Sequence, residues 1–342
     1  MRETVAIADW VTALKAAAEP TRMRLLMLLA HNELSVKDLT LILGQSQPRL
    51  SRHLKLLNEA GLVERYREGS WAYFHLTDRT PLQRHALGLL ASIAHDDPIV
   101  ERDRVRAAAL KAEREAAAQA YFRSHAADWD RIRALHVAEA DVEAAMREAL
   151  GEGPFAVFVD LGTGTGRMLE LFQDRFERGL GIDANQAMLG HARSRLSTGV
   201  PGRVQVRHGD IYNLGLPDGS ASVVCMHQVL HYLADPRRAI MEAARVLAPG
   251  GELLIADFAP HELEFLREKE AHERLGFSTE LIVQWMRDCG LEPRLTRALE
   301  PQGDRGDGKL TVCIWLARRP KLAGASMPVA PQEIRTQIRE AS

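Results

Sequence analysis

The sequence has few cysteines and no long apolar segment. The three cysteines, Cys225, Cys289 and Cys313, are widely spaced and form no CxxC pair, which excludes a disulfide scaffold and a cysteine-cluster metal site. No apolar run approaches the ~18 residues that a membrane-spanning helix needs, and the chain does not begin with a basic and then apolar signal segment. We therefore expect a cytoplasmic protein in a reducing environment.

An excess of charge of one sign is also missing. The 342 residues carry 44 basic and 46 acidic side chains, so the chain as a whole has no field that would attract nucleic acid or a membrane. Any contact with nucleic acid must come from a local cluster of basic residues. The length is sufficient for two domains that each bury a core.

The N-terminal part has the pattern of a helix-turn-helix. Two amphipathic helical patterns cover residues 9–30. Ser35, followed three residues later by Asp38, is a variant of the capping box and predicts a short helix, which Gly44 ends. Ser46 is placed to cap a further helix. On one face of that helix lie three leucines, Leu50, Leu54 and Leu57.

The solvent side of this last helix is polar and basic. Its residue types contact phosphates and base edges in a DNA major groove, and they are Gln47, Arg49, Ser51, Arg52, His53 and Lys55. Residues 62–67 and 71–76 then predict a β-hairpin, the wing, to which Arg65 and Arg67 belong. From residue 45 to residue 67, five Arg and Lys residues stand against two Glu, so the basic patch is local, as a DNA-binding face would be.

Several ordered motifs carry a resemblance to a known family. The motifs lie in residues 13–26, 33–39, 47–57 and 60–63, and in their order and spacing they resemble the ArsR/SmtB family of bacterial winged-helix repressors. The resemblance covers about residues 5–95. It implies a homodimer, joined by the first helix and a helix at about residues 81–94, that binds an inverted repeat in double-stranded DNA with one recognition helix per half-site.

The positions at which members of this family bind metals carry other residues here. Where arsenic- and cadmium-sensing members place thiolates, this chain has Ser35, Val36 and Lys37, so no thiolate is present to bind a soft metal. His85 and His95 on the dimerisation helix can be considered as zinc ligands, but the carboxylate and histidine spacing of the zinc sensors is missing. We expect no metal site and an inducer that is not a metal.

Residues 157–169 predict a buried strand, a glycine turn and the first turn of a helix, because an apolar run ends at Asp160 and an amphipathic pattern follows the glycines. Glycine lets a ligand approach the backbone, and a helix N-terminus presents free N–H groups. Gly162, Gly164 and Gly166 give the spacing GxGxG, which differs from the GxGxxG of dinucleotide-binding turns. This difference disfavours NAD.

Strands and helices alternate from Phe155 to about Arg319, which predicts an α/β fold with a parallel sheet and right-handed crossovers. The helices expected between the strands are 167–176, 186–196 and 236–247. Ligands of such sheets bind at the carboxyl ends of the strands. Polar residues follow four of these ends, and they are Asp160, Asp183, Asp210 and His227.

The acids at these ends favour a cationic ligand. Asp183 is placed to accept both ribose hydroxyls, and Asp210 can take an adenine amino group. A positively charged sulfonium is attracted by two or three acids, whereas a pyrophosphate is repelled by them. The pattern therefore favours S-adenosylmethionine over a dinucleotide.

A second resemblance covers residues 157–258. The chain resembles the class I S-adenosylmethionine-dependent methyltransferases in residues 160–166, 181–183, 209–210, 216–220, 229–233 and 245–253, and residues 295–316 look like the family's final antiparallel hairpin. The resemblance implies a Rossmann-like sheet and S-adenosylmethionine as cofactor, with S-adenosylhomocysteine as product or effector. The residues expected at the cofactor are Tyr121, Asp160, Gly162, Thr163, Gly164, Gly166, Asp183, Ala184, Met188, Asp210, Ile211 and His227.

Residues 96–150 are expected to be helical throughout. Residues 99–120 are rich in Ala, Arg and Glu and predict a stiff, exposed spacer helix, which can also coil against its dimer mate. Tyr121, Phe122 and Trp129 then concentrate aromatic rings in a chain that is only 6% aromatic. These rings can anchor the linker on the next domain. The segment also resembles the lid that precedes many small-molecule methyltransferase domains, and both roles are compatible.

Methyl transfer requires chiefly alignment of the reacting atoms, and a base is optional. The fourth strand ends in residues 225–228 without the Asn/Asp-Pro-Pro-Tyr/Phe motif of enzymes that methylate amides and exocyclic amines, which disfavours a nucleic-acid base as acceptor. The cysteine trio of arsenite methylators is not apparent either. A small-molecule acceptor remains. His227 is a candidate for the cofactor pocket, and His231 for a catalytic base that faces the acceptor.

Three functions are compatible with the sequence. The first is a repressor with an active methyltransferase domain. The second is a regulator that only senses S-adenosylmethionine or S-adenosylhomocysteine through the methyltransferase fold and passes the change to the dimer through residues 96–150, and the third is an enzyme that uses its winged helix only to dimerise. The basic recognition face disfavours the third. The expected segments are a DNA-binding and dimerisation domain (1–95), a helical linker and lid (96–150), a methyltransferase domain (151–319) and a flexible tail (320–342).

Overall fold

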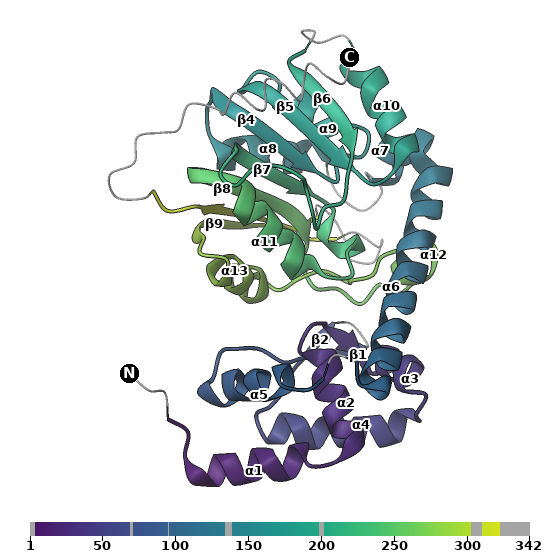
Figure 1. The fold of residues 1–342 in the computed structure, drawn as a ribbon. Coiled ribbons are helices and arrows are strands. Elements are labelled where there is room, and N and C mark those ends of the chain that lie inside the picture. Colours follow the sequence, from purple (N-terminus) through teal and green to yellow (C-terminus); the bar gives the residue numbers. More distant parts are fainter. Residues whose placement is uncertain are drawn as a thin grey trace. The chain divides into compact units, whose positions relative to one another are not determined.

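The computed structural model describes residues 4–68, 71–94, 96–133, 139–197, 202–301 and 310–321. The chain divides into two compact units, Met1–Ala116 and Ala117–Ser342. The boundary falls inside helix α6 (Pro98–His125), so the expected linker is shared between the two units (Figure 1). Most of the tail that was expected to be flexible, from residue 322 on, lies outside the described residues.

The N-terminal unit is a helix-turn-helix with a wing, as predicted. Its elements are α1 (Ile7–Ala17), α2 (Pro20–Leu29), β1 (Leu34–Ser35), α3 (Val36–Leu43), α4 (Gln47–Glu59), β2 (Glu64–Glu68), β3 (Trp71–His75) and α5 (Pro81–Ala91). The short strand β1 was not expected; it pairs with β3 and gives a sheet of order β1-β3-β2. Leu50, Leu54 and Leu57 are fully buried, which confirms the core face of α4.

The capping residues of α3 are confirmed, and the predicted cap of α4 is wrong. The Asp38 N–H donates to Ser35 Oγ at 3.2 Å, and the Ser35 N–H donates to Asp38 Oδ2 at 2.9 Å. Gly44 ends α3 with a φ of +67°. Ser46 precedes α4, but its side chain makes no capping hydrogen bond. Pro48 occupies the second position of α4 and removes one of the two N–H groups that such a cap can accept.

The first part of α6 is anchored, which corrects the prediction of an exposed spacer. Asp103 is 3% exposed and accepts two hydrogen bonds from the Arg24 guanidinium, at 2.5 and 2.8 Å. Arg114 makes an ion pair with buried Asp38, the capping residue of α3. A buried carboxylate requires such a partner. Helix α6 is also longer than the predicted 99–120.

The C-terminal unit is built on a seven-stranded sheet of order β6-β5-β4-β7-β8-β10-β9, which confirms the α/β class. The strands are β4 (Phe155–Leu161), β5 (Phe176–Asp183), β6 (Val204–His208), β7 (Ala221–His227), β8 (Leu247–Phe258), β9 (Glu292–Leu299) and β10 (Val312–Arg318). The first five are parallel, and β10 is antiparallel to β8 and β9. The final antiparallel hairpin is therefore confirmed, although residues 302–309 of its turn lie outside the described residues.

Helices cover both faces of this sheet (Figure 1). The helices are α7 (Trp129–Arg133), α8 (Glu139–Leu150), α9 (Arg167–Leu171), α10 (Gln186–Leu196), α11 (Pro236–Val246), α12 (Phe265–Lys269) and α13 (Thr279–Asp288). α11 and α13 share one buried core with Val159 and Leu161, and α8 and α9 share another with Phe158. Neighbouring strand residues alternate between the two cores, as the period of a strand requires.

The prediction of a helix from 167 to 176 is wrong at its end. α9 ends at Leu171, and Phe176 is the first residue of β5. Phe172, directly after α9, and Phe176, at the start of β5, are both fully buried. Their rings pack with that of Phe158 in one core.

Strand β4 lies between β5 and β7, where the chain order of the sheet reverses. In a doubly wound sheet this is the position at which ligands bind. None of the helices in the described ranges is long and apolar enough to cross a membrane.

Candidate functional site

The glycine turn at the end of β4 is held by the neighbouring strand. The N–H groups of Gly162 and Thr163 donate to the Ile182 carbonyl at 2.8 and 3.1 Å. Gly162 has a φ of +67°, and a Cβ added there would lie 2.5 Å from Val229 Cγ2. Only glycine fits this position, because both the positive φ and the packing against Val229 exclude a side chain.

Two of the predicted acids meet at this turn. Asp160 is 2% exposed, and its Oδ2 accepts the Thr163 hydroxyl at 2.6 Å. Asp183 accepts the N–H of Gly164 at 2.8 Å through Oδ2 and the N–H of Asn185 at 2.7 Å through Oδ1. Burial, with a contribution from the charge of Asp183, raises the pKa of Asp160 to about 7. Burial also raises the pKa of Asp183. A cation bound here would favour the charged form of both acids.

The third predicted acid lies beside the second. The Gly209 N–H donates to the Asp183 carbonyl at 3.1 Å, which places Asp210 and Ile211 next to the end of β5. Asp210 is exposed, and its Oδ1 accepts the N–H of Tyr212 at 2.9 Å. The predicted residues that lie at the carboxyl ends of β4, β5 and β6 are Asp160, Gly162, Thr163, Gly164, Gly166, Asp183, Ala184, Asp210 and Ile211.

The aromatic segment before the sheet lies over the glycine turn. A Cβ on Gly164 would lie 3.7 Å from Trp129 Nε1, and Asp130 accepts the Thr165 hydroxyl at 2.8 Å. Trp129 is in a cluster with the predicted residues Tyr121 and Met188. Burial raises the pKa of Tyr121 to about 12. The segment thus packs on the glycine turn, and its role as a lid stays a prediction.

Arg133 lies near these acids and was not expected there, and its charge acts on Asp160 and His227. Its side chain is 9% exposed, and its Nε lies 3.2 Å from Glu139 Oε2. Burial, followed by the charge of Arg133, holds the pKa of His227 well below its usual range. His227 is 6% exposed, and its Nε2 has no hydrogen-bond partner among the described residues. This edge of the sheet therefore combines acids, the Arg133 guanidinium and a neutral imidazole.

His231, the candidate base, pairs with a carboxylate that was not singled out from the sequence. Its Nδ1 lies 2.7 Å from Asp257 Oδ1, and the two side chains are 1% and 0% exposed. The N–H groups of Leu230 and Phe258 donate to the Asp257 carboxylate at 2.9 and 2.8 Å. Both candidate histidines thus lie near the ends of β7 and β8.

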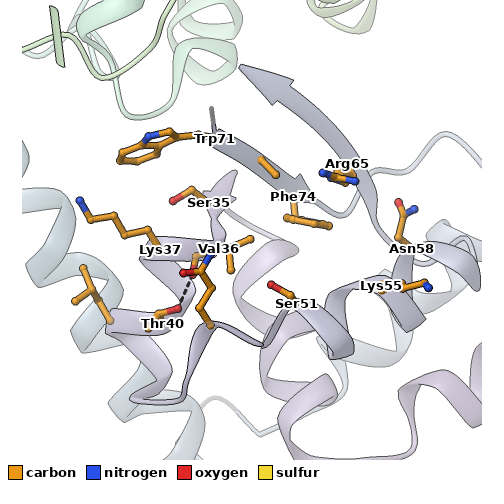
Figure 2. A pocket seen from close by; sticks show the side chains of 13 residues that line it. Ser35, Val36, Lys37, Thr40, Ser51, Lys55, Asn58, Arg65, Trp71 and Phe74 are labelled. Carbon is orange, nitrogen blue, oxygen red and sulfur yellow. Dashed lines mark hydrogen bonds between the residues drawn. The ribbon is translucent and has the colours of Figure 1, made fainter. Parts of the chain in front are cut away.

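In the N-terminal unit, the predicted DNA-contact residues form two exposed sets. A groove of about 760 Å³ lies between α4, the start of α3 and the wing, and Figure 2 shows side chains that line it. The predicted residues in its lining are Gln47, Ser51, Lys55 and Arg65. The predicted residues that are exposed outside it are Arg49, Arg52 and Arg67.

His53 belongs to neither set, and the prediction that it contacts DNA needs correction. Its side chain is 14% exposed, and its Nδ1 lies 3.8 Å from Glu19 Oε2 at the start of α2. Lys37 and Trp71 are among the residues of the groove that were not expected as contacts. Lys37 Nζ lies 5.2 Å from the centre of the Trp71 indole, a cation–π arrangement at the edge of the groove (Figure 2).

The histidine considered as a zinc ligand has a local role. His85 Nδ1 lies 2.5 Å from the Pro81 carbonyl, and its ring makes an edge contact with Trp10 at 5.5 Å. His95 lies outside the described residues. In the part of the chain that the structure describes, no group of three or more His, Cys, Asp or Glu side chains is placed to hold a metal ion.

Comparison with known proteins finds a match for each unit. A family model described as "Bacterial regulatory protein, arsR family" matches residues 19–65, and one described as "Methyltransferase domain" matches residues 159–255. An uncharacterized HTH-type transcriptional regulator of Methanocaldococcus jannaschii is 38% identical over 65 residues, which are 19% of this chain and 73% of that protein.

The C-terminal unit matches methyltransferases. A "Probable S-adenosylmethionine-dependent methyltransferase" of Mycolicibacterium smegmatis is 36% identical over 107 residues, which are 31% of this chain. The match spans 39% of that protein's own length. A methyltransferase structure from a complex with the Trm112 activator of Haloferax volcanii has a TM-score of 0.51 and 22% identity, and covers 60% of this chain and 98% of that one. This last likeness concerns the fold alone.

Proposed function

Because the chain belongs to the ArsR family of bacterial regulatory proteins through its N-terminal unit and carries a methyltransferase domain whose cofactor is S-adenosylmethionine, we propose that it is a DNA-binding transcriptional regulator that methylates a small molecule. The observation that carries the proposal is the presence of two candidate sites in one chain. One is an exposed basic face on α4 and the wing, and the other is a glycine turn beside buried Asp160 and half-buried Asp183.

The proposed DNA contact uses the open face of the winged helix. In a homodimer, α4 of each protomer enters a major groove, and its half-site lies one helical turn from the other. Arg49 and Arg52 are exposed on α4, and Arg65 and Arg67 are exposed on the wing. Guanidinium groups bind phosphates and guanine edges with two hydrogen bonds, so this set suits both roles.

The residues of the pocket fit S-adenosylmethionine. The glycine turn carries no side chains at positions 162, 164 and 166, and Asp160 and Asp183 offer negative charge to a sulfonium and to ribose hydroxyls. Arg133 supplies the cation that the carboxylate of the methionine part needs. Asp210 is placed next to Asp183 for the adenine amino group.

The alternative is a regulator that only senses the cofactor, and α6 supports a regulatory link in either case. Its first part pairs with Asp38 through Arg114, and Asp38 caps the helix that precedes the recognition helix. Its last turns carry Tyr121, which lies in the aromatic cluster of the lid. In the sensor alternative, α6 is the segment through which a change in the lid on ligand binding would reach the N-terminal unit.

Gel-shift titration tests the proposal. A duplex selected from a random library supplies the operator, and its affinity is measured with no cofactor, with S-adenosylmethionine and with S-adenosylhomocysteine. We expect specific binding that changes between the cofactor forms. Failure to select any duplex would refute the regulator, and the absence of cofactor binding by calorimetry would refute the methyltransferase pocket. Cofactor binding without methyl transfer to any metabolite extract would favour the sensor.

A further inference from the structure

The carboxyl edge of the sheet has two parts with different chemistry. The acids Asp160, Asp183 and Asp210 follow β4, β5 and β6. His231 and Asp257 lie on the other side, after β7 and near the end of β8, and these strands are neighbours with His227 opposite Ala256. Since the acids serve the cofactor, the β7 and β8 side faces the position of the methyl acceptor.

The geometry around Asp257 fixes the state of His231. The carboxylate accepts the N–H of Leu230 through Oδ2, at 2.9 Å, and the N–H of Phe258 through Oδ1, at 2.8 Å. It therefore acts as an acceptor toward His231 too, and Nδ1 carries the proton of the 2.7 Å contact. The lone pair is then on Nε2, which is buried and has no hydrogen-bond partner among the described residues.

Aromatic and imidazole rings pack around the His231 ring. Its centre lies 4.0 Å from that of Tyr232, 4.3 Å from that of His272, a second titratable ring, and 4.7 Å from that of Phe258. The Tyr232 ring centre in turn lies 4.7 Å from that of Phe122 and 6.1 Å from that of Trp129. These ring contacts favour an aromatic acceptor beside the base, and exclusion of water strengthens a hydrogen bond to the base.

We propose that His231 is the catalytic base of methyl transfer, that Asp257 is its positioning residue, and that the acceptor is a hydroxyl group on an aromatic molecule. The inference rests on the proposed function. A hydroxyl needs a base because its oxygen still carries a proton. A carboxylate acceptor is already ionised at neutral pH and would not need His231 and Asp257.

Methyl transfer to the hydroxyl is a single displacement. The acceptor oxygen forms a bond to the methyl carbon, and the carbon–sulfur bond breaks with its electron pair passing to sulfur, which gives S-adenosylhomocysteine. The acceptor proton passes to His231 Nε2. The resulting imidazolium keeps its Nδ1–H on Asp257 and releases the added proton to water when the product leaves.

Nitrogen NMR of histidine-labelled protein, without cofactor or acceptor, tests the tautomer. His231→Gln assigns the signal. We expect a protonated Nδ1 and an unprotonated Nε2, and we expect Asp257→Asn to mix the tautomers. A protonated Nε2 in the wild type would overturn the proposal, whatever activity is found.

Activity is measured as S-adenosylhomocysteine released with phenol, 2-naphthol and 4-nitrophenol as acceptors, and with benzoate as a counterpart that has no hydroxyl group. His231→Gln should lower kcat for phenol by roughly 100-fold or more, and the loss should be smaller for 4-nitrophenol, which ionises without help. Asp257→Asn should make the rate with phenol rise with pH, because hydroxide replaces the base. His191→Gln, an exposed histidine of α10, is the matched control and should keep wild-type activity.

Calorimetry of S-adenosylmethionine binding separates a failure of the proposed function from a failure of the proposal for His231. If the wild type does not bind the cofactor, the proposed function fails. If it binds the cofactor but methylates none of the phenols, or if folded His231→Gln is as active as the wild type, only the present inference fails. Methylation of benzoate would likewise overturn the assignment of the acceptor.

Discussion

The two sites of the chain differ in exposure. Arg49 and Arg52 stand open to solvent on α4, whereas Asp160 and His231 are 2% and 1% exposed. DNA makes many phosphate contacts with an open protein surface, and water and salt weaken each of these contacts. A small ligand makes few contacts, and burial makes each of them strong. Substitutions in the pocket should therefore cost more than substitutions on the DNA face.

The largest effect is expected at Asp183. Asp183→Ala removes the acceptor for the proposed ribose hydroxyls and also the acceptor for the N–H groups of Gly164 and Asn185. Cofactor affinity should fall by about 100-fold, or roughly 2.7 kcal/mol. Calorimetry with S-adenosylmethionine measures it. Asp174→Ala is the control, since that carboxylate is 59% exposed and pairs with Arg147. Equal affinity of Asp183→Ala and the wild type would disprove the ribose assignment.

The glycine turn should respond next. Gly162→Ala places a methyl group 2.5 Å from Val229 at a φ of +67°, and we expect the free energy of unfolding to fall by about 2 to 3 kcal/mol. Urea denaturation measures it. Gly190→Ala is the matched control, because nothing lies within 4 Å of its added Cβ and no positive φ is involved. A tolerated Gly162→Ala would show that the turn is not closely packed.

The buried acid predicts a dependence of stability on pH. The pKa of Asp160 is about 7 in the folded chain, against an ordinary value of 3.8. The fold thus favours the protonated acid, and its stabilising contribution is present below pH 3.8 and lost as the pH rises through about 7.

Without cofactor, the wild type should therefore lose stability from pH 5 to pH 8. Asp160→Asn should remove about 2 kcal/mol of this loss, because the amide does not ionise. Denaturation at the two pH values measures it. A wild type and an Asp160→Asn variant with the same dependence would contradict the raised pKa.

Local features of both sites were predictable, and distant pairs were not. Ser35 and Asp38 are three residues apart, so the capping box follows from spacing alone. The glycine turn, likewise, lies within one strand-turn-helix pattern. Arg24 and Asp103 are 79 positions apart, and His231 and Asp257 are 26 apart. Only the fold selects these partners, because Arg and Asp occur throughout the chain.

The position of Asp257 near the end of β8 is a feature from which a site residue could have been predicted. Asp257 lies near the carboxyl end of its strand, as Asp160 and Asp183 do at theirs. The same rule that selected those acids would have selected Asp257 as a ligand-side residue. Its pairing with His231 depends on the turn after β7, which brings His231 back over β8, and no pattern in the sequence fixes that turn.

The smallest effect is expected on the DNA face. Arg52→Ala removes one exposed guanidinium, and operator affinity should fall by about 1 kcal/mol, with a salt slope lower by about one. Gel shifts at several salt concentrations measure both. Arg104→Ala on α6, whose side chain is 73% exposed, should leave both unchanged. If Arg52→Ala instead cost as much as Asp183→Ala, the open face would have to close around its ligand, and the contrast between the two sites would not hold.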